Sequence, residues 1–251
     1  MLVLLVCLFS SVIGAVSGIG GGIVMRPVLE MTTPYGVELV SFLSSCAVFA
    51  MAVVALTRRR TRAAFDHRRG TMLAIGSACG GVAGKLLFTY FSNQFLGKLQ
   101  TVLLMVIALG LLIHLCLQKH IRPQNLQNQA LYLPLGLALG LVSTFLGIGG
   151  GPLNLAILNY FLDMNLKTAS LYSLYIILLS QAASFLFMLI MGTIPAFSWT
   201  VMMCAIAGGI GGGLLGSLIG RRIQEKDLRY LYMGVLIFVF IIAGINLRSS
   251  L

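Results

Sequence analysis

The sequence predicts an all-α polytopic membrane protein, with about eight hydrophobic segments arranged as two inverted repeats. Three observations favour this fold class: an apolar composition, a repeated glycine motif and the distribution of basic residues. Hydrophobic residues make up 59% of the 251 residues and charged residues only 9%, whereas soluble domains carry roughly 25% charged residues. No stretch has the composition of a separate soluble domain, so we expect the segments to lie in a lipid bilayer.

The string GIGGG occurs twice and divides the chain into similar halves. The first copy begins at Gly18 and the second begins 129 residues later, at Gly147. At the same offset, "SFLSS" (41–45) lies over "SLYSL" (170–174). Such internal duplication is common in transporters. Further along the chain the offset becomes 132, where "GSACGGVAG" lies over "GGIGGGLLG": residues 76–84 and 208–216.

Each half contains two short apolar arms around its glycines, followed by three longer apolar segments. The segments of the first half are 1–16, 21–31, 37–57, 70–91 and 96–118, and those of the second are 131–146, 150–162, 166–190, 198–220 and 228–247. Because the N-terminal segment has a counterpart in the second half, we expect it to be mature sequence and not a signal peptide. The predicted organisation is a first transmembrane repeat, a cytoplasmic linker and a second transmembrane repeat: residues 1–120, 121–130 and 131–251.

Basic residues gather in three connections, which decide how the two halves face. These connections are 58–69, 119–122 and 221–229. If each GIGGG segment forms a glycine-broken re-entrant hairpin, each repeat crosses the membrane three times and the copies are inverted. All three connections then lie in the cytoplasm, as the positive-inside rule requires. With an even number of crossings, 221–229 would lie outside. The inverted arrangement therefore fits better, and it places the N-terminus outside.

The net charge of +11 follows from the same rule, because basic residues crowd the cytoplasmic loops of membrane proteins. No basic stretch is long enough to form a nucleic-acid-binding domain, so no nucleic acid partner is expected. The six acidic residues lie at segment edges or in loops, and no H-E-x-x-H motif is present. The sequence therefore predicts no enzyme, no metal and no cofactor.

Four glycines in five residues are unfavourable inside a membrane helix, since each costs about 1 kcal/mol relative to alanine. Irregular backbone survives at membrane depth only where protein buries it or where it lines a wet cavity. A helix that begins at the glycines directs its free N–H groups and its positive dipole end toward them. The alternative is that the glycines only allow tight packing. The backbone interpretation predicts a small anion near the midplane, held at Gly18, Gly20, Gly21, Gly22, Gly147, Gly149, Gly150 and Gly151.

Four polar side chains are predicted to join this site. Ser44, Ser45 and Ser173 lie on the segments that follow the hairpins. Their hydroxyls either bind the anion or the hairpin backbone, or bond back to their own helices. Asn154 follows three residues after Gly151, and it either donates to the ligand or caps the hairpin.

Two prolines and two cations complete the candidate residues. Pro27 and Pro152 are expected to shape the hairpins, with Pro152 at a first helical position. Arg26 either clamps an oxyanion or pairs with Glu30, four residues away and near the surface. Lys85 either faces a cavity and attracts anions, or extends to the membrane interface. The glycines spaced by four from residue 76 and from residue 208 are expected to allow close helix packing.

The duplicated motif resembles the sulfite exporter TauE/SafE family over nearly the whole chain. "GIGGGIVMRP" (18–27) and "GIGGGPLNLA" (147–156) carry the resemblance, together with "TASLYS" (168–173) and the glycine-rich third segments. The second copy departs from the first, because it has Ala156 where the first has Pro27. The resemblance implies transport of a small sulfur-containing or organic anion, such as sulfite, sulfoacetate or thiosulfate, driven by ion gradients.

The expected function is therefore a secondary transporter, an exporter by resemblance, in the cell (inner) membrane. An anion channel is the alternative, because the same half-helices can line a pore. The expected partners are the substrate anion and the lipid bilayer, and a homodimer is left open.

Overall fold

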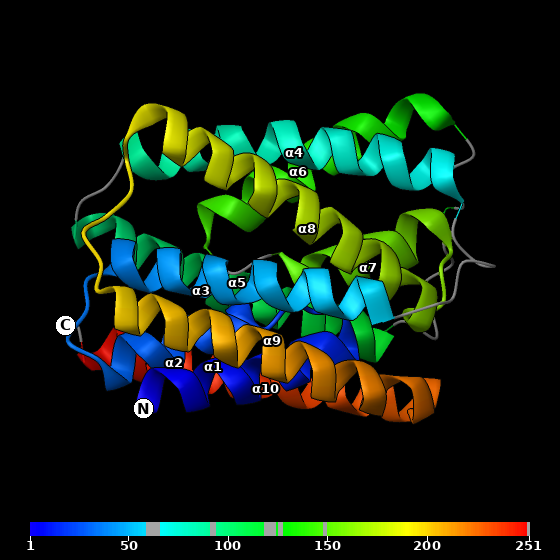
Figure 1. The fold of residues 1–251 in the computed structure, drawn as a ribbon. Coiled ribbons are helices and arrows are strands. Elements are labelled where there is room, and N and C mark those ends of the chain that lie inside the picture. Colours follow the sequence, from blue (N-terminus) through cyan, green and yellow to red (C-terminus); the bar gives the residue numbers. More distant parts are fainter. Residues whose placement is uncertain (59–65, 91–93, 118–123, 125–127, 148–149, 250–251) are drawn as a thin grey trace.

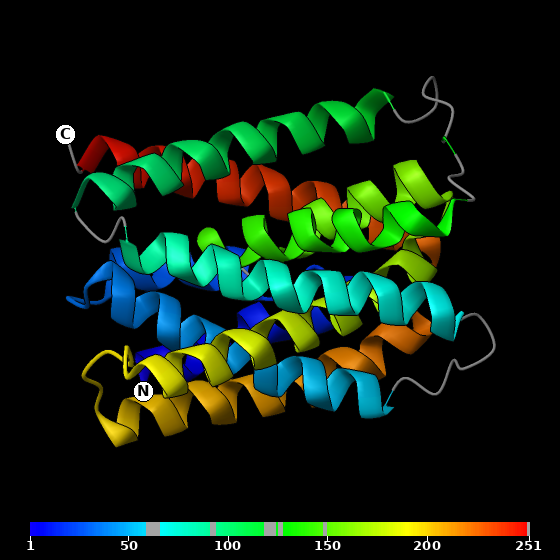
Figure 2. The same cartoon turned by 90° about the horizontal axis from the view of Figure 1, so that it is seen from above.

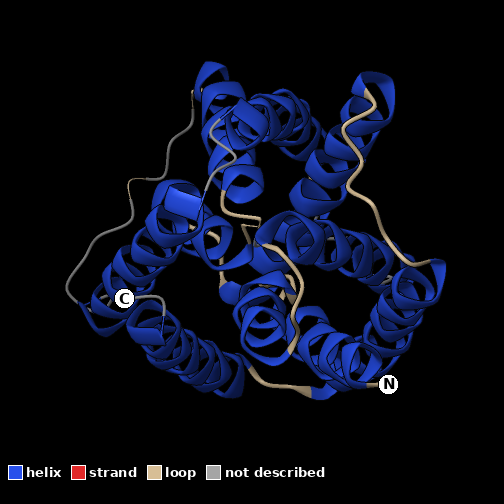
Figure 3. Cartoon of the chain, turned by 90° about the vertical axis from the view of Figure 1, so that its left-hand side faces the viewer, coloured by secondary structure: helices blue, strands red, loops and turns tan. Residues whose placement is uncertain are grey.

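The computed structural model describes the chain except for residues 59–65, 91–93, 118–123, 125–127, 148–149 and 250–251, and except for the side chains of 67 and 94–98. The described residues are helical apart from short connections. The helices are α1 (Leu2–Ser17), α2 (Gly22–Thr32), α3 (Val37–Arg58), α4 (His67–Tyr90), α5 (Gln94–Leu117), the 3-10 turn η2 (Gln129–Leu131), α6 (Tyr132–Phe145), α7 (Gly151–Leu162), α8 (Leu166–Met191), α9 (Trp199–Arg222) and α10 (Glu225–Ser249). They run roughly along one axis (Figure 1), and Figure 3 looks along that axis.

Within the described residues, six helices are long and apolar enough to cross a membrane: α3, α4, α5, α8, α9 and α10. The helices on either side of the GIGGG motifs are shorter, with 16 and 11 residues in α1 and α2 and 14 and 12 in α6 and α7. At 1.5 Å per residue, the longest of these covers about 24 Å, less than the roughly 30 Å of hydrocarbon in a bilayer. The eight expected segments are therefore six potential spans and two pairs of short helices.

The two short pairs open toward opposite ends of the bundle. In Figure 1, α1 begins and α2 ends at the left, where both termini lie, whereas α6 begins and α7 ends at the right. The helix ends at the right also include the end of α3, the end of α9 and the start of α8. Most basic residues of the described helices belong to these right-hand ends: Arg58, Arg68, Arg69, Lys167, Arg221, Arg222, Lys226 and Arg229.

The same helix packing occurs twice. The first arm of each short pair lies along a long helix of the other half: α6 packs on α4, and α1 packs on α9. In the same way, α3 contacts α9 and α8 contacts α4, while α5 and α10 pair with each other. Figure 2 shows α5 and α10 together along one side of the bundle. Each half therefore completes the packing of the other.

Glycines make these contacts close, as predicted. A Cβ at Gly80 would lie 2.1 Å from the Leu137 carbonyl oxygen of α6, and one at Gly212 would lie 2.5 Å from the Leu8 carbonyl oxygen of α1. Real Cβ atoms do not approach so closely, so only glycine fits. The residues that meet are offset by 132 and 129, as in the sequence alignment. The glycines in these two stripes are Gly76, Gly80 and Gly84 on α4 and Gly208, Gly212 and Gly216 on α9.

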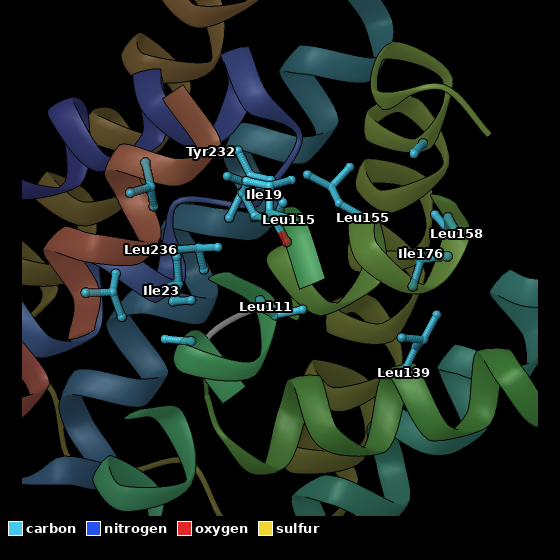
Figure 4. Packing of buried hydrophobic residues seen from close by; sticks show 14 of the residues in the cluster. Ile19, Ile23, Leu111, Leu115, Leu139, Leu155, Leu158, Ile176, Tyr232 and Leu236 are labelled. Carbon is cyan, nitrogen blue, oxygen red and sulfur yellow. The ribbon is translucent and has the colours of Figure 1, made fainter. Parts of the chain in front are cut away.

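A hydrophobic cluster surrounds the tips of both short pairs. It joins Ile19 and Ile23 of the first pair to Leu155 and Leu158 of the second, and Tyr232 of α10 is also part of it (Figure 4). Each of these side chains is at most 2% exposed. The irregular backbone between the short helices is thus buried in protein, the condition under which it is tolerated at membrane depth.

Candidate functional site

The first GIGGG motif forms a turn between α1 and α2. Gly18 caps α1 with φ 74°, and its N–H donates to the Gly14 carbonyl at 2.8 Å. Gly20 also has a positive φ, of 72°. Glycine adopts this left-handed region without the steric cost that a Cβ brings. The chain then enters α2 through Gly21, and Gly22 is its first residue.

The second motif forms the corresponding turn between α6 and α7. Gly147 has φ 62°, and Gly150 caps the start of α7 with φ 66°. Gly151 is the first residue of α7. The predicted site residue Gly149 lies outside the described residues. Both motifs are therefore breaks at which a new helix begins, as the sequence analysis expected.

The two turns touch each other. A Cβ at Gly151 would lie only 1.2 Å from the Ile19 carbonyl oxygen, so the backbone of the first turn rests directly on the start of α7. Each turn also packs against a serine of the other half. A Cβ at Gly18 would lie 2.3 Å from Ser170 Cβ, and one at Gly147 would lie 3.0 Å from Ser41 Oγ. Ser41 and Ser170 are themselves 129 residues apart, so the exchange of contacts is reciprocal.

The predicted polar residues divide into two groups. Asn154 and Ser173 meet, because Asn154 Nδ2 donates to Ser173 Oγ at 3.4 Å. Asn154 Oδ1 and the hydroxyl of Ser44 are buried and have no hydrogen-bond partner in the described part of the chain. Ser45 is half-buried and lines a cavity beside Gly147. Buried polar groups without a partner are costly, so these atoms mark places where a ligand or water is needed.

Both hairpin prolines are tied to α10. Pro152 lies in the first turn of α7, where its missing N–H is tolerated, and its carbonyl accepts from Tyr232 at 2.7 Å. Pro27 lies inside α2, and its carbonyl accepts from Asn246 Nδ2 at 3.1 Å. The two short pairs therefore share α10 as a support, although their prolines occupy different helical positions.

Arg26 forms a network that the sequence analysis anticipated only in part. Its Nε donates to Glu30 Oε1 at 2.8 Å, the expected i,i+4 pair, but Arg26 is only 4% exposed and does not lie near the surface. Its Nη1 and Nη2 donate to the Leu146 carbonyl and to Gln100 Oε1. Gln100 Nε2 in turn donates to the Phe145 carbonyl at 2.6 Å. The first short pair thus satisfies the free carbonyls at the end of α6, next to the second turn.

Lys85 faces a cavity beside the second turn, the first of its two predicted alternatives. The cavity measures about 10 Å³, about the space that one water molecule needs. Ser41, Thr144, Gly147, Gln181 and Ser184 line it together with Lys85. The Lys85 ammonium lies 4.5 Å from the ring centre of Phe88.

A larger cleft adjoins this cavity through Lys85 and Phe88, which line both. The cleft measures about 270 Å³ and includes Glu38 and the connection from α8 to α9 at Thr193. In Figure 1 that connection lies at the left, at the same end as both termini. Lys85 therefore stands between the second glycine turn and one end of the bundle.

Comparisons with known proteins agree with this architecture. The family model for the sulfite exporter TauE/SafE matches residues 3–243. The chain is also similar to a protein of Bacillus subtilis (strain 168) described as probable membrane transporter protein YunE, with 23% identity over 92% of each chain. No solved structure matches the chain significantly. With its six apolar helices and a family match over nearly its whole length, this multi-pass membrane protein belongs to the sulfite exporter TauE/SafE family of membrane transporters.

Proposed function

We propose that the protein is a secondary transporter that moves a small anion across the membrane, with two inverted repeats that each carry a re-entrant hairpin. The pairs α1–α2 and α6–α7 are the proposed hairpins. Their helices are too short to span a bilayer, and they open toward opposite ends of the bundle (Figure 1). The reciprocal contacts of Gly18 with Ser170 and of Gly147 with Ser41 support a two-fold relation between the halves, as in other transporters built from inverted repeats.

The proposed orientation follows from charge. The basic right-hand ends of the bundle in Figure 1 would face the cytoplasm, and both termini would lie outside. We expect a reporter fused after residue 251 to behave as an external domain: alkaline phosphatase active, green fluorescent protein dark. The same reporters fused after Arg222 should give the opposite pattern and serve as the matched control. A fluorescent C-terminal fusion would contradict the inverted arrangement.

The expected sign of the substrate follows from the polar groups at the turns. The helices α2 and α7 both begin at buried glycines, where free N–H groups and the positive dipole end favour an anion. Lys85 adds a positive charge beside Gly147. The family description names sulfite, so we propose sulfite, thiosulfate and sulfoacetate as the first candidates, with export as the direction.

The observation that carries the proposal is the meeting of the two glycine turns at Gly151 and Ile19, inside the protein. In a passive anchor, two costly helix breaks at one point would bring no benefit, whereas in a transporter they form a central site around which the repeats move. The cavity beside Gly147 is small and mostly enclosed, which favours alternating access over the continuous pore of a channel.

Flux into proteoliposomes tests this function. We expect uptake of radiolabelled sulfite or thiosulfate to saturate with concentration and to respond to an imposed ion gradient. Protein-free liposomes give the background. An anion current that neither saturates nor couples to a gradient would favour the channel, and no flux with any of these anions would contradict the proposed substrate class.

A further inference from the structure

The polar cavity beside the second turn has no polar counterpart beside the first. Four side chains give the cavity much of its polar lining: Ser45, Thr144, Gln181 and Ser184. The offset of 129 residues pairs the side chains of α6 and α8 with those of α1 and α3. The glycine contacts support this pairing, because Gly81 meets the Ser180 carbonyl as Gly213 meets the Met51 carbonyl. The structural counterpart of every lining residue can therefore be read directly.

Those counterparts are apolar. Thr144, Gln181 and Ser184 correspond to Ala15, Ala52 and Ala55, and Ser45 corresponds to Leu174. All four counterparts are fully buried in one hydrophobic cluster, in which Met51 and Ile177 fill the space between them. Lys85 corresponds to Ser217, whose hydroxyl donates to the Leu214 carbonyl of its own helix at 2.8 Å. The position beside Gly18 thus has neither the donors nor the charge of the cavity.

We propose that the protein binds its anion at one asymmetric pocket, formed by Lys85, Ser41, Thr144, Gln181 and Ser184 beside Gly147, and not at two equivalent positions. This inference rests on the proposed transport function and gives its substrate site. The first repeat contributes Lys85 and Ser41, and the second contributes the turn and α8. The apolar cluster beside Gly18 keeps the other half of the two-fold arrangement closed to anions.

The charges around the pocket fit this assignment. Lys85 makes no hydrogen bond or ion pair within the described residues, and Ser41 Oγ is buried without a partner. Arg26 is close by, since its Nη1 lies 2.9 Å from where a Cβ at Gly147 would be, but Glu30 balances its charge. The acidic residue on the other side of Lys85 is Glu38, which lines the cleft and not the pocket. An anion that enters through the cleft therefore meets Glu38 first and Lys85 second.

The chemistry of the lining defines the class of ligand. An ammonium group, three hydroxyls and an amide are hydrogen-bond donors spread around a small volume. A compact oxyanion with several acceptor oxygens, such as sulfite, satisfies more of these donors than a carboxylate with a long apolar tail. Since the cavity now has room for about one water molecule, the pocket must widen toward the cleft when the anion binds.

Binding to purified variants in detergent tests the pocket. The probe is whichever of sulfite, thiosulfate and sulfoacetate stabilises the wild-type protein most against heat, with its Kd then measured by calorimetry. Lys85→Met should raise Kd at least about tenfold, because a charged hydrogen bond in a buried site is lost. Gln181→Ala and Ser184→Ala copy the first repeat and should each raise Kd several-fold.

Ser217→Ala is the matched control, because Ser217 occupies the position of Lys85 in the other repeat. Its Kd should stay within about twofold of wild type. If Lys85→Met does not purify as a monodisperse protein, Lys85→Gln and Gln181→Ala carry the test. If wild type binds an anion and these variants bind it equally well, the pocket is wrong while the transport function stands. If wild type binds none of the three anions, the substrate class of the proposed function is wrong as well.

Discussion

Gly151→Ala should be the most damaging single-methyl substitution in this protein. The new Cβ would lie 1.2 Å from the Ile19 carbonyl oxygen and 1.8 Å from its carbonyl carbon. Both are backbone atoms, so no side-chain rotation relieves the overlap and the two turns must separate. Overpacking of this kind usually costs 1–3 kcal/mol, and a backbone collision at the centre of the fold should cost more, about 4 kcal/mol. We expect a large fall in apparent Tm, or loss of the monodisperse protein.

Gly110→Ala and Gly234→Ala are the matched controls. A Cβ at either position would meet no described atom within 4 Å, and both lie inside long helices, where alanine is the better helix former. Their Tm should equal or slightly exceed that of wild type. The measurement is thermal unfolding in detergent, followed by size-exclusion chromatography of fluorescent fusions. A Gly151→Ala protein as stable as these controls would contradict the direct contact between the turns.

Arg26→Leu should be the second most damaging change. The guanidinium joins Glu30, Gln100 and the Leu146 carbonyl at a position only 4% exposed. Its removal leaves a partly buried carboxylate without its cation and a free carbonyl at the end of α6. Breaking a buried pair on one side typically costs 3–5 kcal/mol, and we expect a loss near the lower end because Glu30 keeps some exposure to solvent.

A double-mutant cycle separates the lost pair from the lost packing. Leu155 occupies the position of Arg26 in the second repeat, so a leucine is compatible with this helix. Arg26→Leu combined with Glu30→Gln should recover part of the stability lost by Arg26→Leu alone, since no unpaired charge is left. The thermal unfolding of the four proteins gives the coupling. Additive losses would mean that the pair contributes nothing and that packing dominates.

Much of the fold could be predicted from the sequence, because its signals are local. Four glycines in five residues end one helix and start another wherever they occur, so α2 and α7 begin at Gly22 and Gly151, as expected. Apolar length sets which helices can cross a bilayer. The duplication also allowed the correspondence between the halves to be drawn before any contact was known. Gly80 and Gly212 then met α6 and α1 at matching residues.

The candidate site was less predictable, since its polar residues depend on contacts between distant segments. Arg26 bonds the Leu146 carbonyl across 120 residues of sequence, and a local pattern offers only the i,i+4 partner Glu30. Gln100, Gln181 and Ser184 carried no motif at all. One signal was available: the alignment pairs Gln181 and Ser184 with Ala52 and Ala55, and polar residues on one side only of a duplicated, otherwise apolar helix indicate a function.

The sequence by itself determined the membrane character, the two homologous halves and the position of both helix breaks, because composition, repetition and glycine content act over a few neighbouring residues. Only the tertiary structure decided that the two turns touch at Gly151 and Ile19, that Arg26 closes the end of α6, and that Lys85 faces a cavity beside Gly147 and not the membrane interface. These facts depend on how far apart the helices lie and which faces they turn to each other. Periodicity and spacing along one chain do not contain that information.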